Sequence, residues 1–140
     1  MYILDTNVIS EIRKAKSNRA DTNVIAWANS TPSSEMFVSA ITILELEMGV
    51  LAKQRKDPEQ GNILRAWLDN HVMIAFADRI LPFDTAIAQR CAKLHIPNPK
   101  SDRDAMIGAT ALTHGMRLVT RNVADFQWMN LDIINPWENS

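Results

Sequence analysis

Short apolar runs alternate along the chain with longer segments in which apolar residues recur at helical spacing. The short runs predict strands over residues 2–4, 36–39, 79–81, 118–120 and 131–134. Strands that alternate with helices are typical of a parallel sheet, because parallel neighbours need a long crossover connection. The pattern therefore predicts an α/β fold with a mostly parallel central sheet.

The helical segments are delimited by residues that favour helix ends. Asp21, Asp84 and Asp102 are each predicted to cap the helix that follows. Pro58 suits the first position of a helix, and Gly115 suits the residue that ends one. The predicted helices are residues 7–14, one that follows Asp21, 42–54, 58–76, one that follows Asp84, 102–114 and the helical turn 123–129.

Apolar residues recur at helical spacing along the predicted helix 42–54, at Ile41, Leu44, Met48 and Leu51. We expect this stripe to face the core, as the apolar side of an amphipathic helix does. Gly49 lies in the middle of the same helix, where glycine costs about 1 kcal/mol relative to alanine. The glycine predicts that another backbone passes close to this helix.

The composition is that of an ordinary globular protein. The 140 residues are 46% hydrophobic and 22% charged, and the formal net charge is -1. No apolar run approaches the roughly 20 residues that a membrane span needs, and the first residues lack the features of a signal peptide. We expect one cytoplasmic domain over residues 1–140, with no membrane attachment. Because the net charge is close to zero, nucleic acid would have to be bound through a local site.

Asp5 stands directly after the first predicted strand and directly before a helix. In open parallel sheets, ligands bind in the crevice at the carboxyl ends of the strands, so an acid at this point is well placed for function. The alternative is that Asp5 only caps the helix that begins near Asn7, a position that aspartate favours. From the residues alone, both interpretations have equal support.

Two further acids lie on predicted helices. Glu45 adjoins the apolar stripe and can lean toward the sheet edge, whereas Glu47 points to the opposite side and is expected in solvent. Asp104 shares a helix face with Ile107 and Ala111, which ties it to the buried side, where a charge needs a partner. The alternatives are a surface role for Glu45 and, for Asp104, a favourable interaction with the helix dipole.

A fourth polar segment follows the predicted strand 118–120. Asn122 and Asp125 are three residues apart, and their side chains converge if the segment is helical. An Asx turn in which Asn122 caps the next helical turn is the alternative.

Carboxylates gathered in one crevice repel each other, and the pKa of each is raised unless a cation is present. Mg²⁺ or Mn²⁺ suits such an all-oxygen site, and a divalent ion can polarise a phosphoryl oxygen and activate a bound water. The acids therefore predict metal-dependent phosphodiester hydrolysis. Other chemistries lack support, because Cys91 lies on an apolar helix face, the three histidines lack zinc-ligand spacing and the four glycines form no cluster.

These segments resemble, in order, the motifs of a PIN domain. The resemblance begins at Leu4-Asp5-Thr6-Asn7 and continues at Thr42-Ile43-Leu44-Glu45-Leu46 with Gly49, and at Asp104 with Ile107-Gly108-Ala109-Thr110-Ala111. The later segments resemble the tail of the VapC-type toxins: Thr120-Arg121-Asn122, Asp125-Phe126 and Asn135-Pro136-Trp137. The opening residues 1–11 are similar to those of the FitB-like subgroup, and the match spans the whole chain.

The resemblance implies a three-layer α/β/α sandwich and an endoribonuclease that depends on Mg²⁺ or Mn²⁺. It implies the toxin of a type II toxin–antitoxin system, neutralised by a small DNA-binding antitoxin of the VapB or FitA type. It also implies a homodimer, and a dimer of toxin–antitoxin pairs on operator DNA.

The resemblance also assigns site residues. Asp5, Glu45 and Asp104 match the acidic metal-site positions of the family. Many PIN domains have an aspartate where this chain has Asn122, so either Asn122 or Asp125 is expected at the fourth position. The supporting hydrogen-bonding residues would be Thr6, Asn7 and Thr120.

Two alternatives to a ribonuclease stay open. The chain could act mainly as an antitoxin-binding module in operon autoregulation, although such a module has no need of the acids. A metal-dependent DNA nuclease would differ only in its substrate, because no residue reports a contact with a ribose 2′-hydroxyl.

An antitoxin is expected to reach the acids with an arginine, since a guanidinium pairs bidentately with carboxylates such as Glu45 and Asp104. The apolar part of the antitoxin would lie on the first helices, around Ile9, Ile12, Ile25 and Trp27. The alternative is that these residues belong to the core, and core packing is favoured for Ile9 and Ile25. The basic segments 13–19 and 53–56 are expected to be solvated surface, with guidance of a phosphate backbone as the alternative.

Overall fold

The computed structural model describes residues 1–138, and its centre is a parallel sheet of five strands. The strands lie in the order β3-β2-β1-β4-β5, and every neighbouring pair is parallel. Their bounds are β1 (Tyr2–Leu4), β2 (Met36–Ser39), β3 (Ile80–Leu81), β4 (Arg117–Val119) and β5 (Ile133–Ile134). The order of the strands reverses at β1, so the ligand crevice of this sheet is expected at the carboxyl end of β1.

Helices connect the strands as the alternating pattern predicts. They are α1 (Thr6–Arg13), α2 (Thr22–Ser30), α3 (Ala40–Lys56), α4 (Pro58–Trp67), α5 (Met73–Ala75), α6 (Thr85–Leu94), α7 (Asp102–His114) and α8 (Val123–Phe126). A π-helical segment, Leu68–Val72, joins α4 to α5, so the predicted helix 58–76 is nearly continuous. No helix in the described residues is long and apolar enough to cross a membrane.

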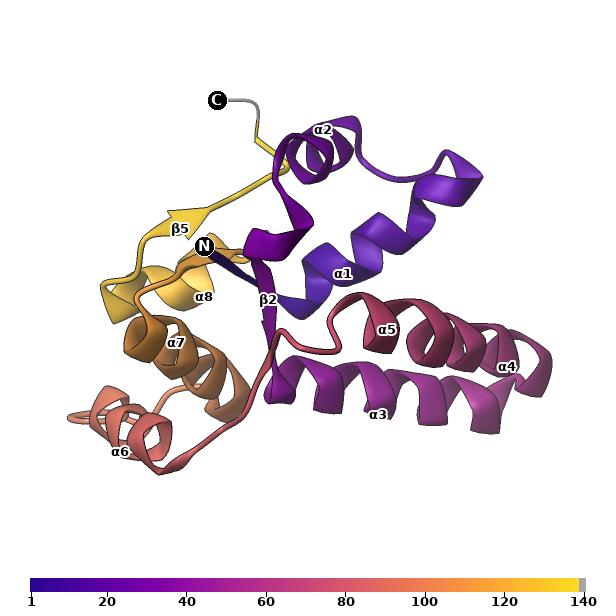
Figure 1. Cartoon of the computed structure of the whole chain (residues 1–140). Helices are drawn as coiled ribbons and strands as arrows, with labels where there is room; N and C mark the ends of the chain where they lie inside the picture. The colour runs from indigo at the N-terminus through magenta and orange to yellow at the C-terminus, as the bar shows by residue number, and fades with distance from the viewer. Residues whose placement is uncertain (139–140) are drawn as a thin grey trace.

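The helices form a layer on each side of the sheet, as Figure 1 shows. On one side, Leu4 and Val38 of the sheet pack with residues of α1, α3 and the α4–α5 segment. On the other side, Ile3 and Leu118 pack with residues of α7 and α8, and α6 covers α7. The predicted three-layer α/β/α sandwich is therefore confirmed. The predicted domain of residues 1–140 ends in residues 139–140, which lie outside the described part.

Several predicted helix ends are confirmed. The side chain of Asp21 accepts hydrogen bonds from the N–H groups of the first turn of α2, and Asp84 does the same for α6. Gly115 ends α7 in the left-handed conformation, with φ 63°. The prediction for Asp102 is wrong: Ser101 is the N-cap, and Asp102 is the first residue of α7. An acid in the first turn remains favourable there because of the helix dipole.

The face of α3 that packs on the sheet differs from the prediction. Thr42, Leu46 and Val50 are buried. Of the stripe expected in the core, Ile41 packs against buried residues, whereas Leu44, Met48 and Leu51 are about half exposed. The helix carries apolar residues on two sides. Thr42 lies on the side that packs on the sheet, although the apolar periodicity did not predict its burial because threonine is polar. The prediction for Gly49 is also wrong, because no atom lies within 4 Å of a Cβ built there.

The close contact occurs at Gly61 instead. A Cβ built on Gly61 of α4 would lie 2.3 Å from the Cα of Gln54 in α3. Backbone atoms cannot yield as the end of a side chain can, so only glycine permits this approach of α4 to α3.

We expect Gly61→Ala to lower the free energy of unfolding by about 1–3 kcal/mol or more, because it overpacks a backbone contact. Gly49→Ala is the matched control, and it should raise the free energy of unfolding by up to about 1 kcal/mol, since α3 gains helix propensity without a clash. Urea unfolding of both variants measures the difference. Equal stabilities would contradict the close approach.

Candidate functional site

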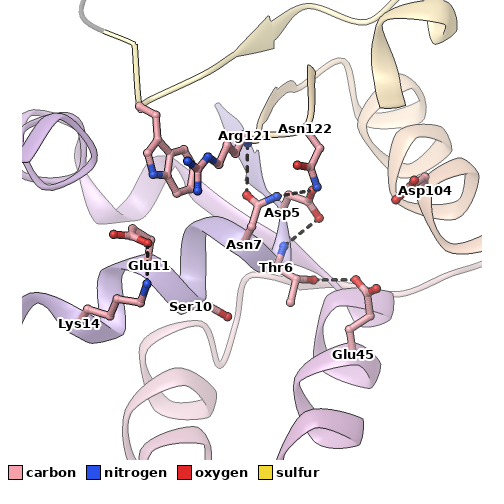
Figure 2. Close-up of a pocket in the computed structure, with 11 residues that line it drawn as sticks. Asp5, Thr6, Asn7, Ser10, Glu11, Lys14, Glu45, Asp104, Arg121 and Asn122 are labelled. Atoms are coloured by element: carbon pink, nitrogen blue, oxygen red, sulfur yellow. Dashed lines mark hydrogen bonds and ion pairs between the residues drawn. The ribbon is translucent and has the colours of Figure 1, made fainter. Parts of the chain in front are cut away.

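A cavity of about 450 Å³ opens at the carboxyl end of β1, where the strand order reverses. Three of the predicted acids, Asp5, Glu45 and Asp104, line this cavity together. Figure 2 shows that they come from the end of β1, from α3 and from α7. The other residues that line it are Thr6, Asn7, Ser10, Glu11, Lys14, Arg121, Asn122 and Trp137.

Asp5 is both a helix cap and a lining residue of the cavity. Its backbone N–H donates to the carbonyl of Val119 at 2.9 Å, which continues the β1–β4 pairing by one residue. Its carboxylate, at the N-cap of α1, accepts hydrogen bonds from Thr6 N at 2.8 Å and from Thr120 Oγ1 at 2.8 Å. Asn7 Nδ2 lies 3.3 Å from the same carboxylate. The capping prediction for Asp5 is therefore confirmed, and the same residue also lines the cavity.

Burial raises the pKa of Asp5 to about 6, and it is the largest influence on that group. The negative charges of Glu45 and Asp104 raise the pKa further, while the hydrogen bonds from Thr120 and Thr6 lower it. Asp5 is only 5% exposed. Its ionised form is therefore costly in the protein alone and would be favoured by a nearby cation.

The segment after β4 is tied to Asp5 through Thr120 and Asn7. The hydroxyl of buried Thr120 donates to Asp5, and it accepts from Asn7 Nδ2 at 3.3 Å and from Asn122 N at 3.0 Å. Arg121 N donates to Asn7 Oδ1 at 3.3 Å. Asn122 precedes α8 but its side chain makes no capping hydrogen bond, so the Asx-cap alternative is wrong. The amide of Asn122 lines the cavity instead.

Glu45 is held from two sides. The hydroxyl of Thr6 donates to Glu45 Oε1 at 2.7 Å, and Arg103 Nε lies 3.8 Å from Glu45 Oε2. Glu45 is therefore an ordered, half-buried carboxylate rather than a free surface glutamate. Glu47, expected in solvent, forms an ion pair with Arg65 at 2.9 Å on the α4 side of α3.

Asp104 and Asp125 form the far part of the acidic region. Burial raises the pKa of Asp104, and the charges of Asp125 and Glu45 raise it further, against the hydrogen bond from Ser101 and the charge of Arg103. Asp125 is exposed on α8 and does not line the cavity. It acts on the cavity only through its charge next to Asp104.

The acids surround the cavity without meeting at one point. Among residues 1–138, no three acidic, histidine or cysteine side chains are close enough together to hold a metal ion as they stand. The charge of Glu45 nevertheless raises the pKa of both Asp5 and Asp104, and carboxylate, hydroxyl and amide oxygens are the donor set of a hard cation. The donor chemistry fits Mg²⁺ or Mn²⁺, provided that the side chains move closer together.

The opposite end of the cavity carries two positive charges: Lys14, from the basic segment 13–19, and Arg121, which the sequence did not assign to a site. Lys14 Nζ lies 3.2 Å from buried Glu11, which also accepts from Asp21 N at 2.8 Å. The Arg121 guanidinium lies over the ring of Trp137 at 5.3 Å. Asn7, Glu11 and Lys14 recur at helical spacing in α1 and at its C-cap, so the sequence could have predicted that they share a face. Arg121 and Trp137 are distant in sequence, and only the folded structure brings them to the same cavity.

An apolar groove of about 300 Å³ lies on the other side of α1. Two residues of the expected antitoxin surface, Ile9 and Ile12, line this groove, together with Met36, Trp67, Val72 and Phe76. The other two lie elsewhere. Ile25 lines a hollow beside Ala20, and Trp27 packs edge-on against Tyr2 at 5.5 Å.

Known proteins resemble this chain over its full length. The model of the PIN domain family matches residues 2–127. The chain is 38% identical over 143 residues to VapC ribonuclease Y4jK of Sinorhizobium fredii, covering 99% of each chain. It is 34% identical over 145 residues to Toxin FitB of Neisseria gonorrhoeae, covering 99% of this chain and 100% of that one. The solved structure of FitAB bound to IR36 DNA fragment matches with a TM-score of 0.87 at 32% identity, covering 100% of this chain and 98% of that chain.

We expect Asp5→Asn to stabilise the metal-free protein at pH 8 by up to about 3 kcal/mol. The folded pKa of Asp5, about 6, lies above its usual value of 3.8, so this group lowers stability as the pH rises from about 4 to 6. The gain in the variant should therefore shrink to less than about 1 kcal/mol near pH 4, where the folded wild-type carboxyl is protonated and the unfolded one is only about half ionised.

Thermal or urea unfolding at pH 4 and pH 8 in EDTA measures this difference. Asp84→Asn, at the exposed N-cap of α6, is the matched control and should show no such gain. If Asp5→Asn instead destabilised the protein at both pH values, its capping role would outweigh the burial of its charge.

Proposed function

Because the chain belongs to the PIN domain family, we propose that it is a metal-dependent endoribonuclease and the toxin of a type II toxin–antitoxin pair. The observation that carries this proposal is the group of three carboxylates, Asp5, Glu45 and Asp104, around one cavity at the strand-order reversal. The similarity to a VapC ribonuclease and to Toxin FitB supports both the activity and the biological role.

In this proposal Asp5, Glu45 and Asp104 hold Mg²⁺ or Mn²⁺, and Asn122 takes the fourth position. Asn122 is preferred to Asp125 because it lines the cavity and Asp125 does not; Asp125 adds negative charge beside Asp104. The chemistry that such an ion supplies is polarisation of a phosphoryl oxygen and activation of water. Thr6, Asn7 and Thr120 orient the carboxylates through the hydrogen bonds described above.

Arg103 has to leave Glu45 before that carboxylate can bind an ion. The Arg103 side chain is 46% exposed and its contact with Glu45 is 3.8 Å long. Exposed ion pairs of this kind contribute little to stability, so the rearrangement is inexpensive.

The alternatives receive less support. A module that only binds an antitoxin gains nothing from a buried carboxylate whose pKa is raised to about 6, since that charge weakens the fold. A DNA nuclease would use the same carboxylates. The preference for RNA rests on the similarity to a VapC ribonuclease.

We expect cleavage of RNA to stop in EDTA and to return with Mg²⁺ or Mn²⁺. Asp5→Asn, Glu45→Gln and Asp104→Asn should each reduce cleavage at least about 100-fold, because each removes a charged ligand. Glu47→Gln is the matched control on α3, since Glu47 pairs with Arg65 outside the cavity.

The assay uses labelled single-stranded RNA and DNA of equal sequence. Undiminished cleavage in EDTA would contradict the metal mechanism. Cleavage of DNA but not RNA would favour the nuclease alternative, and tight antitoxin binding without any cleavage would favour the binding module.

We propose that a second copy of the chain covers the exposed stripe of α3. Leu44, Met48 and Leu51 are 47%, 48% and 57% exposed, and Arg103 Nη1 lies 3.4 Å from Met48 Sδ. A straight apolar helix face can pair with its own copy about a two-fold axis. The homodimer, joined by two antitoxins, would give the pair of complexes expected on operator DNA, and the similarity to DNA-bound FitAB supports that assembly.

The antitoxin is proposed to lay an amphipathic helix in the apolar groove beside Ile9 and Ile12 and to extend an arginine toward Glu45 and Asp104. Both parts lie within reach of α1, whose Ser10 and Glu11 face the cavity while Ile9 and Ile12 line the groove. Helix-in-groove binding of this kind is a common mode of peptide recognition.

We expect mutation of one arginine, or one pair of arginines, in the C-terminal half of the cognate antitoxin to restore RNA cleavage. The reason is that a guanidinium neutralises the carboxylates and competes with the metal. Co-expression with the neighbouring small gene, followed by cleavage assays of the purified complexes, measures the effect. If no arginine matters, inhibition is steric and the groove alone accounts for it.

A further inference from the structure

A hollow outside the main cavity has no role in the proposed chemistry. It has a volume of about 340 Å³ and lies between the end of α6, the loop 95–101 and the turn that follows α8. Lys93, Lys100 and Trp128 line it, together with Leu94, Ile96, Pro97 and Asn98. It therefore combines two cations with an aromatic ring and apolar surface.

Trp128 is held in place although it is not buried. The residue is 37% exposed, and its indole N–H donates to the backbone carbonyl of Asp125 at 2.7 Å. Lys100 Nζ lies 5.1 Å from the centre of the ring. An exposed indole whose orientation is fixed by its own N–H presents a ready surface for stacking, because little conformational freedom is lost when a ligand binds.

The loop that carries Lys100 is also fixed. His95 Nδ1 accepts the backbone N–H of Lys100 at 3.0 Å, so the residue is anchored to the end of α6. His95 Nε2 lies 4.0 Å from the exposed Asp102, which is the one carboxylate that the described ion pairs bring to this loop. The lysine ammonium groups therefore remain available to a ligand.

Asp125 links the hollow to the acidic end of the main cavity. Asp125, whose carbonyl holds Trp128, raises the pKa of Asp104 through its charge. Lys100 stands four residues before Asp104, just ahead of α7. Figure 1 shows α7 and α8 next to each other on the same side of the sheet, and α6 packs against α7.

We propose that this hollow binds one nucleotide of single-stranded RNA next to the scissile bond, with its base stacked on Trp128. Lys100 moves off the ring and, with Lys93, pairs with the adjoining phosphate. Aromatic stacking combined with nearby cations is the general means of binding single strands. The inference rests on the proposed function, since it identifies where the substrate of that same site is held.

An RNA strand is favoured over a peptide of the antitoxin by the chemistry of the hollow. A nucleotide has a flat base, which can stack on the indole of Trp128, and a phosphate, which can pair with the ammonium groups of Lys93 and Lys100. The apolar face of an antitoxin helix fits the groove beside Ile12 better, because apolar residues line most of that groove.

The test measures RNA binding without cleavage. The Asp5→Asn protein in EDTA is titrated against a fluorescein-labelled single-stranded RNA of about ten nucleotides, a length typical of single-strand sites, and Kd is read from anisotropy. Adding Trp128→Ala should raise Kd at least about 5-fold, whereas Trp128→Phe, which keeps a stacking ring, should stay close to the parent. An RNA backbone without bases should bind the Trp128→Ala protein and its parent equally.

Lys100→Ala should raise Kd and reduce the slope of log Kd against log salt by about 0.7, the value for one phosphate contact on a single strand. Lys56→Ala is the matched control, because Lys56 is exposed at the far end of α3. Melting temperatures of all variants accompany the titrations, and Lys100→Ala with its control carries the test if Trp128→Ala unfolds.

Unchanged binding by folded Trp128→Ala, or equal effects of Lys100→Ala and Lys56→Ala, would overturn the inference. So would a Trp128→Ala protein that loses affinity for the antitoxin but not for RNA, or a parent protein that binds no RNA. The proposed function is judged separately, by metal-dependent cleavage of the same RNA by the wild type. If the wild type cleaves RNA but Trp128→Ala binds RNA normally, the proposed function is supported and the binding role of the hollow is not. If Trp128→Ala weakens base-dependent binding but the wild type cleaves no RNA, only the binding role of the hollow is supported.

Discussion

The burial of one carboxylate at the end of the central strand is the constraint on which the rest of the site depends. Asp5 ends the β1–β4 pairing, caps α1 and accepts a hydrogen bond from the hydroxyl of Thr120, the residue that follows the neighbouring strand β4. Moving any of these elements would leave a buried charge without its donors, which is strongly unfavourable. The first helix and the segment after β4 are therefore positioned by the same group that faces the cavity.

That carboxylate lowers stability in the protein alone. The hydrogen bonds from Thr120 and Thr6 offset only part of the effect of burial, since the pKa of Asp5 stays near 6 with Glu45 and Asp104 nearby. A chain selected for stability alone would place an uncharged residue here. The proposed function accounts for this unfavourable charge, because a divalent ion, or an arginine of the antitoxin, would offset it on entering the cavity.

The features predicted correctly from the sequence are those with local signals. The strand before Asp5, the caps at Asp21 and Asp84, and the stop at Gly115 each follow from a few neighbouring residues. The buried face of α3 was mispredicted because this helix is apolar on two sides, and packing on the sheet selects between them. Asp5, Glu45 and Asp104 line one cavity as expected, but Asp125 does not. Arg121 was not expected there, because it meets α1 only in the folded chain.

The single helix α1 explains how one small domain can serve both a substrate and a protein inhibitor. Its Asn7 and Glu11 face the polar cavity, while Ile9 and Ile12 line the apolar groove. In the proposed complex, the partner's chain would have to pass around α1, about 10–12 Å wide with its side chains, for one of its side chains to reach the acids. In the proposed complex, residues on one face of α1 would contact the bound partner, and residues on the other face would line the acidic cavity. Mutations could therefore change the affinity for the partner without changing the acidic cavity.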